Sequence, residues 1–363
     1  MSTLAAIGVL AVLIFVHELG HFLAARLQGI YANKFSIGFG PVLLKYQGKQ
    51  TEYALRALPL GGFVGFPDDD PDSDIPANDP NLLRNRPLLD RAIVISAGVI
   101  ANLIFAYFLL VVQVSVTGFQ QISYHPGVVV SGIADNLSTA AGKAGIQAMD
   151  IVLAVDNQEL GSAKPAIVKL MAEIQNHAQQ PITLKVQRGA ETLDLKVTPD
   201  ANAEGKGQIG VKLAPNADIT IERSISLIDA LVKGANEFER VVVLTFQGLA
   251  QLVTNFGETA TQIAGPIKIV EIGSSIASTN IAGLLQFGAL ISINLAVMNI
   301  LPLPALDGGQ LAFLLFEGLL GKPLPMKLQE TVMQTGLFLL LGLGVFLVIR
   351  DTANLSSVQQ FFE

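Results

Sequence analysis

The sequence contains no cysteine, and charged residues make up only 15% of its 363 residues. Without cysteine, disulfide scaffolds, cysteine-ligated zinc sites and thiol nucleophiles are excluded. Ordinary soluble domains carry roughly 25% charged residues, so the low charge and the hydrophobic content of 51% argue against a disordered or wholly soluble chain. The formal net charge of -7 leaves no basic surface for nucleic acid, and no nucleic-acid partner is expected.

The charge-poor stretches are long enough to cross a membrane, which takes about 20 mostly apolar residues. They predict four transmembrane helices, near residues 3–25, 92–116, 283–305 and 331–349. The first stretch could instead be a cleaved signal peptide. No lysine or arginine precedes it, however, and it contains two histidines and a glutamate, which a signal peptide would not favour. We therefore predict an integral, multi-pass membrane protein.

Lysine and arginine residues near the span ends indicate the orientation of the chain. They flank the segment between the first and second spans and occur again between the last two spans, whereas residues 117–142 after the second span have none. This distribution predicts that residues 26–91 and 318–330 face the cytoplasm. The large middle region is then expected outside.

Composition divides the chain into four parts: residues 1–117 with two spans and a Gly-rich β-hairpin region, a domain over 118–218, an amphipathic helical segment over 219–270, and the last two spans over 271–363. The acidic run at 68–74 is predicted to be a solvated linker, because it lacks the EF-hand spacing that calcium binding would favour.

The domain over 118–218 shows the alternation of a small α+β fold. Strands are predicted over 128–133 and 151–155, a helix over 164–177, and a hairpin from 182–187 and 192–197. The run AGIQAMDIVLAVD at 144–156 resembles the signature of PDZ domains, with Met149 where glycine is usual. The predicted fold class is therefore a polytopic α-helical membrane protein with about four spans, a membrane-associated β-hairpin region and an inserted α+β PDZ domain.

Two of the four histidines stand in the sequence His17-Glu18-Leu19-Gly20-His21, an HExxH pattern. A spacing of four residues places both imidazoles on one helix face, where both can bind one metal ion. Glu18 points about 100° away around the helix and can reach a metal-bound water without binding the ion. HExxH is typical of zinc metalloproteases, and ionisable residues inside an apolar helix indicate a functional site. The alternative is a polar cluster that joins helices through hydrogen bonds.

A catalytic zinc site needs a further protein ligand. His125 and His177 lie in the region predicted outside, far from the cytoplasmic end of the first span. Asp307 is the only charged residue in 272–316, and it stands between two prolines and two glycines. Because the first and third spans both run from outside to the cytoplasm, Asp307 and His21 are expected at the same level. We predict Asp307 as the third ligand, the alternative being an ordinary helix-end aspartate.

The HELGH motif in a first span and the Asn-to-LDGG motif in a late span resemble those of the site-two protease family of intramembrane zinc metalloproteases. Within it the chain is similar to the bacterial regulator-of-sigma-E protease group, which carries a PDZ domain between the second and third spans. The resemblance covers essentially the whole chain. It implies one zinc ion per chain, held by His17, His21 and Asp307, with Glu18 as general base.

The resemblance also implies residues that bind substrate. They are Asn294 and Asn299 ahead of the LDGG motif, and Gly61, Gly62 and Phe63 in a membrane-dipping β-loop. On an ideal helix the two asparagines point about 140° apart, so both can face the metal only if the helix is distorted. Gly98 and Asn102 match a G-x-x-x-N element that the family has in its second span.

Members of this family cleave peptide bonds within or near transmembrane segments, usually after a first cut elsewhere. The resemblance implies single-span membrane protein substrates, such as anti-sigma factors or signal-peptide remnants, and a peptide or C-terminus at the PDZ domain. It also implies a bacterial inner membrane, or an organellar membrane of bacterial origin. Three alternatives stay open: a catalytically silent binding or chaperone relative, a membrane-anchored zincin with a soluble active site, and an ion or metal transporter.

Overall fold

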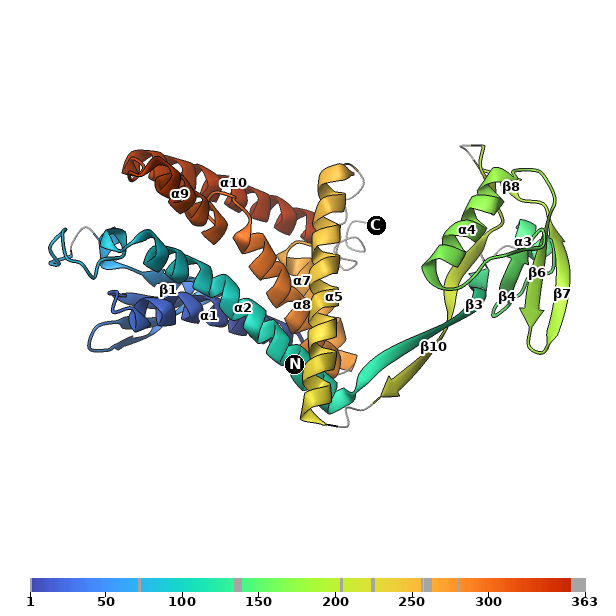
Figure 1. Ribbon diagram of the computed structural model, residues 1–363, viewed down its shortest axis with the longest axis horizontal. Helices are drawn as coiled ribbons and strands as arrows, with labels where there is room; N and C mark the ends of the chain where they lie inside the picture. The colour runs from blue at the N-terminus through green and yellow to red at the C-terminus, as the bar shows by residue number, and fades with distance from the viewer. Residues whose placement is uncertain are drawn as a thin grey trace. The chain divides into compact units, whose positions relative to one another are not determined.

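The computed structural model describes residues 2–70, 73–133, 139–202, 205–222, 226–255, 257, 263–279 and 281–353. Two compact units emerge (Figure 1): a helical unit, Met1–Gly118 with Arg223–Glu363, and an α+β unit, Phe119–Glu222. Parts of four predicted segments lie outside the described residues: 71–72 of the acidic linker, 134–138 and 203–204 of the domain over 118–218, 223–225, 256 and 258–262 of the amphipathic segment, and 280 and 354–363 of the last segment.

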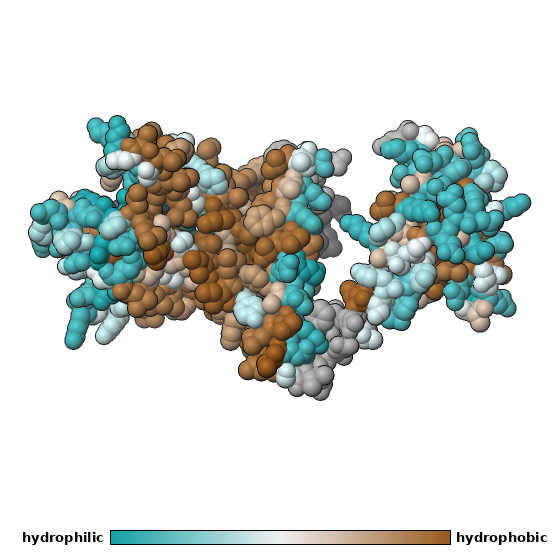
Figure 2. All heavy atoms as spheres, in the orientation of Figure 1, coloured by the Kyte–Doolittle hydropathy of each residue, from teal (hydrophilic) through white to brown (hydrophobic). Residues whose placement is uncertain are grey.

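Four helices of the helical unit are long and apolar enough to cross a membrane, which confirms the predicted fold class. They are α1 (Ser2–Leu27), α2 (Leu88–Thr117), α8 (Ile281–Ile300) and α10 (Met326–Ala353). Hydrophobic residues cover much of the middle of this unit, and hydrophilic residues cover its hairpin end and much of the α+β unit (Figure 2). The apolar exterior is the surface that a lipid environment would cover.

The third span is shorter than predicted, because the helix expected to reach residue 305 ends at Ile300. Pro302 and Pro304 follow, and each lacks a backbone N–H and restricts the residue before it. The chain therefore leaves the helix just before Asp307.

Three further helices complete the described part of the helical unit: α5 (Leu227–Thr254), α7 (Pro266–Thr279) and α9 (Asp307–Leu320). The expected amphipathic character is present in α5, whose buried residues Ala230, Gly234, Glu237 and Val241 recur at helical spacing. Its Val241 joins residues of α2 and α8, among them Leu110 and Ile293, in one buried cluster. The amphipathic segment is thus packed against the spans along this face.

The predicted hairpin region is built from β1 (Lys34–Gln47) and β2 (Glu52–Gly65), which are joined by a turn at 48–51. Each strand bends and contributes two segments to one small sheet. Segment 34–37 lies between 52–55, parallel to it, and 62–65, antiparallel to it, while 42–47 pairs antiparallel with 52–56. Gly38 and Gly40, with φ of 86° and 82°, allow β1 to change direction. Segment 62–65 therefore forms one edge of the sheet.

The α+β unit contains a sheet in the order β10-β3-β4-β6-β7, with β5 paired to β4. Its strands are β3 (Phe119–Ile133), β4 (Ile151–Val155), β5 (Gln158–Glu159), β6 (Ile182–Arg188), β7 (Glu191–Val197) and β10 (Val211–Glu222). The unit also has α3 (Ala140–Lys143), α4 (Ala163–Asn176) and the short pair β8 (Asp200–Ala201) and β9 (Gly207–Gln208). Two 3-10 turns, η1 (Pro67–Asp69) and η2 (Leu83–Asn85), belong to the helical unit.

The predicted strand over 128–133 is only the end of β3, which begins at Phe119. The extra length comes from antiparallel pairing with β10, which continues from Val211–Ile133 to Glu222–Phe119. Pairing with a distant strand left no local signal in the sequence. The other predicted elements of this unit occur at the expected places, with ends shifted by a residue or so.

Candidate metal centre

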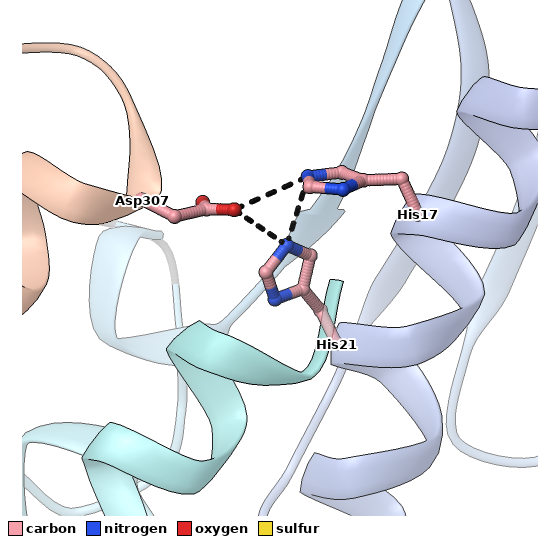
Figure 3. Close-up of side chains that lie close together, drawn as sticks. All are labelled: His17, His21 and Asp307. Atoms are coloured by element: carbon pink, nitrogen blue, oxygen red, sulfur yellow. Dashed lines mark hydrogen bonds and ion pairs between the residues drawn. The ribbon is translucent and has the colours of Figure 1, made fainter. Parts of the chain in front are cut away.

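The HExxH residues lie on α1, and the two histidines converge as their spacing predicts. His17 Nε2 and His21 Nε2 are 3.2 Å apart, and the two rings meet edge to face (Figure 3). By the rise of an α-helix, His17 lies about 22 Å along the axis from Ser2 and about 15 Å from Leu27. The pair is thus placed well inside an apolar helix.

Asp307 reaches the histidines because the chain turns tightly between α8 and α9. Ala305 has a positive φ of 69°, and Asp307 is the first residue of α9. A Cβ on Gly308 would stand 2.1 Å from the Leu301 carbonyl oxygen, so only glycine fits this turn. Asp307 Oδ2 consequently lies 3.2 Å from His17 Nε2 and 3.4 Å from His21 Nε2 (Figure 3).

These three atoms have the geometry of a metal-ligand set. Zinc bonds of 2.0–2.1 Å in a tetrahedral arrangement separate two ligand atoms by about 3.3 Å, close to the three distances observed. Asp307 Oδ2 is buried and accepts no hydrogen bond. Among the described residues, His17, His21 and Asp307 form the one His/Asp/Glu group compact enough to hold an ion. The donor set, two imidazoles and a carboxylate, is one that zinc accepts.

Glu18 lies beside this group and contacts the edge of the hairpin sheet. Its carboxylate accepts a hydrogen bond from the Val64 backbone N–H. A Cβ on Gly62 would stand 2.8 Å from Glu18 Cγ and 2.9 Å from the Ser36 carbonyl oxygen, so glycine permits this close approach. The sheet edge and the HExxH helix are therefore in direct contact at the candidate base.

Gly61 and Phe63, also predicted to bind substrate, flank that contact. Gly61 has φ of 149°, and a Cβ there would clash with the ring of Phe39. The Arg56 guanidinium lies over the ring of Phe63, with its Cζ 5.6 Å from the ring centroid. These contacts fix the shape of the edge, and the substrate role of both residues stays a prediction.

The two asparagines of α8 occupy different surroundings. Asn299 Nδ2 is 3.4 Å from His17 Nε2, beside the candidate metal ligands. Asn294 Oδ1 accepts a hydrogen bond of 2.8 Å from the Thr245 hydroxyl of α5. The helix is continuous through both residues, so the distortion that would turn both toward the metal is not present. Asn294 connects α8 to α5, and its substrate role also stays a prediction.

Two groups next to the site could not be anticipated from side-chain patterns. One is the Val64 N–H, and the other is the Val94 carbonyl, which lies 2.8 Å from His21 Nδ1. Both belong to the backbone, so no residue type marks them.

Two histidines and an aspartate around one point, with a glutamate directly after the first histidine, define a zinc metalloprotease site within a helical membrane protein. The chain belongs to Peptidase family M50, because the model of that family matches residues 5–343. It is a multi-pass membrane metalloprotease.

The chain is similar to named relatives over its whole length. It is 62% identical to all3971 of Nostoc sp. strain PCC 7120, provisionally named a zinc metalloprotease, over 100% of both chains. It is 47% identical to the membrane metalloprotease ARASP, chloroplastic, of Arabidopsis thaliana, over 99% of this chain and 80% of that one. The PDZ domain of the SdrC-like protein Lin2157 from Listeria innocua aligns with 24% of this chain and 92% of that one, at 18% identity and a TM-score of 0.21.

Proposed function

We propose that this metalloprotease hydrolyses peptide bonds within or near transmembrane segments of other membrane proteins. One zinc ion per chain would be held by His17, His21 and Asp307, and Glu18 would be the general base. The observation that carries the proposal is the convergence of the three ligand atoms within 3.4 Å of one another. Two of them belong to α1, a helix that can span a membrane, and the third belongs to α9, which follows the span α8. A hydrocarbon core is about 30 Å thick, so a site about 15 Å from one end of α1 falls inside it.

Each residue of the site has a different role in the proposed reaction. A bound zinc ion supplies Lewis acidity and lowers the pKa of a coordinated water. Glu18, on the adjacent face of α1, is placed to take a proton from water and return it to the leaving amine. The hydrogen bond from Val64 N–H holds the carboxylate against the sheet edge. Asn299, beside His17, is placed to donate a hydrogen bond to the substrate carbonyl.

A helical substrate must unwind before hydrolysis, because its peptide groups are bonded within the helix. Segment 62–65 is an edge of the hairpin sheet, and no other described strand pairs with its outer side. Because the Val64 N–H points outward to Glu18, the backbone groups of Gly62 point outward as well. An extended substrate could add here as a further strand, with its backbone next to the metal centre.

The substrates we propose are single-span membrane proteins that have already been cut once, such as anti-sigma factors or signal-peptide remnants. A single span presents only one helix to be unwound, and a first cut has already shortened its outer part. The cleavage would then serve regulated intramembrane proteolysis.

The α+β unit offers a second place for a peptide. A groove of about 310 Å³ runs between α4 and the β9–β10 segment. Its apolar lining is Ile167, Met171, Ile174, Ile209, Val211 and Leu213. Because β10 is the end strand of its sheet, a peptide or C-terminus could pair with its free edge, as PDZ ligands do.

The host membrane we propose is a bacterial inner membrane or an organellar membrane of bacterial origin. The relatives from Nostoc and Synechocystis are bacterial proteins, and the Arabidopsis relative is named chloroplastic.

The test is cleavage of a single-span substrate by the purified, detergent-solubilised chain beside Glu18→Gln at matched zinc content. The wild type is expected to cut inside the span, and the variant to bind zinc and cut at least 100-fold more slowly. Equal cleavage by both would overturn the assignment of Glu18. If both were inert with zinc bound, the alternative of a catalytically silent binding or chaperone relative would replace the proposal.

A further inference from the structure

Helix α2 lies directly behind the two histidines and contacts both. Three positions spaced by four residues, Val94, Gly98 and Asn102, face α1 and are each buried. The close approach is possible because Gly20 of α1 has no side chain: a Cβ there would stand 2.4 Å from the Ala97 carbonyl oxygen. Residues four apart form one row along a helix, so these three positions make one continuous support.

We propose that this row of α2 is the device that orients the metal ligands. The Val94 carbonyl and the Asn102 side-chain amide would accept hydrogen bonds from Nδ1–H of His21 and His17, and Gly98 would provide the space for both rings. The inference rests on the proposed ligand set, since it assigns the second nitrogen of each ligating ring.

The argument starts from the tautomer that zinc requires. Both Nε2 atoms face Asp307 Oδ2, so each must offer a lone pair to bind an ion. A neutral imidazole that binds through Nε2 carries its proton on Nδ1, and this N–H needs an acceptor when buried. For His21 the acceptor is present, because Nδ1 lies 2.8 Å from the Val94 carbonyl oxygen.

For His17 the corresponding partner is Asn102. Its amide nitrogen lies 3.5 Å from His17 Nδ1, and its amide oxygen is buried without a hydrogen-bond partner. A half-turn of the amide exchanges its nitrogen and oxygen in nearly the same place. In that orientation Asn102 Oδ1 accepts a hydrogen bond from the Nδ1–H of His17, so the amide oxygen and the ring N–H each gain a partner. Asn102 is fully buried, and its backbone carbonyl accepts a 2.8 Å hydrogen bond from the Ser292 hydroxyl, which fixes this turn of α2 against α8.

Gly98 stands between the two acceptors and acts through its lack of a side chain. A Cβ at this position would stand 2.2 Å from His21 Nε2 and 2.8 Å from His17 Cε1. Real atoms do not approach so closely, so any larger residue would push the rings away from Asp307. Space and hydrogen-bond direction thus come from the same helix.

A simple packing role for Asn102 makes a different prediction from an acceptor role. Asn102→Leu keeps the approximate size and removes the acceptor, whereas Asn102→Asp keeps an acceptor oxygen. Loss of a partner that orients a ligating histidine typically costs 10–100-fold in metal affinity. A packing role would make the aspartate variant at least as harmful as the leucine variant.

The experiment measures zinc affinity of the full-length chain in detergent, by competition with a chromophoric chelator, together with the visible spectrum of the cobalt-substituted protein. We expect Asn102→Leu to bind zinc about 10–100-fold more weakly with an altered cobalt spectrum, and Asn102→Asp to stay within a few-fold of the wild type. Gly98→Ala is expected to weaken zinc binding to a similar degree. Gln113→Leu is the matched control, because it removes an amide from the same helix about 16 Å further along the axis, and it should leave zinc affinity unchanged.

The outcomes separate this inference from the proposed ligand set. If His21→Ala and Asp307→Ala weaken zinc binding but Asn102→Leu and Asn102→Asp behave alike, the orienting role is wrong and the ligand set stands. If His21→Ala and Asp307→Ala leave zinc affinity unchanged, the ligand set itself is wrong. Because circular dichroism reports the helical content of each variant, a failure to fold is recognised, and Gly98→Ala then provides the second test at a position with no polar group.

Discussion

At the scale of single residues, Gly62 brings the sheet edge and the candidate base together. We expect Gly62→Ala to lower cleavage at least 10-fold while zinc content stays at the wild-type level. The physical reason is steric, because the new methyl group would press on Glu18 Cγ and the Ser36 carbonyl oxygen and would not touch the proposed metal ligands. Cleavage rate and bound zinc, measured on the same preparation, check this expectation.

The control for that substitution is Gly8→Ala. Gly8 lies on the same helix as Glu18, and a Cβ there would meet no atom within 4 Å. The control should cleave as the wild type does. Full activity of Gly62→Ala would show that the close contact between the edge and Glu18 is not required for catalysis.

A second prediction at this scale concerns pH and the Asp150–Arg188 pair of the α+β unit. Burial opposes the charge of Asp150, but two hydrogen bonds of 2.8 Å from Arg188 and one of 2.8 Å from the Gln147 N–H hold the pKa of this carboxyl below its usual range. Because the folded pKa lies below the unfolded value of about 3.9, the stabilisation is fully present above about pH 4 and is lost as the pH falls through the folded value.

Asp150→Asn should therefore destabilise the α+β unit by about 1–3 kcal/mol at pH 6, and the difference from the wild type should shrink near pH 3. Hydrogen exchange of the full-length chain, compared between wild type and variant at equal pH over β4 and β6, measures it. A difference of the same size at both pH values would contradict the electrostatic explanation.

The sequence predicted the chemically distinctive residues of the site because few other residues could serve. His17 and His21 follow from helical spacing, and Asp307 follows from the scarcity of charge in the last third of the chain. Asn102 was recognisable as part of a motif. Its contact with His17 was not predictable, since the direction of a buried amide depends on the neighbouring helix.

At the scale of elements, the first turn of α2 and the last turn of α9 are joined by a buried ion pair. Arg91 Nη1 lies 2.7 Å from Glu317 Oε2, and the Glu317 side chain is only 4% exposed. Its other oxygen accepts hydrogen bonds from Leu324 N and the Gln329 side chain. Because α9 begins at Asp307, this pair also holds the helix that carries a proposed metal ligand.

Arg91→Met is expected to lower the free energy of unfolding by about 3–5 kcal/mol, because it leaves a buried carboxylate without its cation. Arg91→Met combined with Glu317→Leu should recover most of this loss, since replacing both charges by apolar groups is often near neutral. The free energies of unfolding of the wild type, the single variant and the double variant are measured by titrating each detergent-solubilised protein with a denaturing detergent.

The comparison variant is Arg84→Met, which removes an arginine from a more exposed pair with Asp68, 3.6 Å away. Exposed pairs contribute about 0–1 kcal/mol, so this variant should be close to the wild type. If Arg91→Met were as stable as Arg84→Met, the prediction would be wrong, because Glu317 would not depend on Arg91 as its cation.

The elements themselves were predictable to the extent that their signals are local. Runs without charge predicted the four spans, and alternation predicted β4, β6, β7 and the end of β3 in the α+β unit, but not β5, β8, β9 or β10. The end of α8 depends on the prolines that follow it, whereas the division of β1 and β2 into four paired segments and the length of β3 depend on pairing with distant segments. Pairing between residues far apart in sequence leaves no period to detect.

At the scale of the whole molecule, the proposed chemistry and the peptide groove belong to different compact units. The residues His17, Glu18, His21 and Asp307 are in the helical unit, and the groove is in the α+β unit. The chain enters the α+β unit at Phe119 and leaves it at Glu222, and these two residues are paired across β3 and β10. A short linker can therefore join the two ends without disturbing the helices.

Replacing residues 119–222 by a Gly/Ser linker of about four residues should leave zinc affinity and the cleavage of a short single-span substrate within a few-fold of wild type. Substrates with a folded outer domain, excluded by the wild type if the unit acts as a screen, should now be cut. Zinc affinity and the ratio of cleavage rates for the two substrates measure the result. Loss of zinc would show that the unit supports the metal centre.

A variant with an intact unit distinguishes screening from peptide capture. Met171 lines the groove and is 46% exposed, so Met171→Glu can place a charge in the groove without burying it. If the groove captures the C-terminus left by a first cut, this variant should lower kcat/KM at least 10-fold for substrates with an apolar C-terminus and leave the short substrate unaffected. If the unit only screens by size, Met171→Glu should match the wild type on both substrates, because the volume of the unit is unchanged.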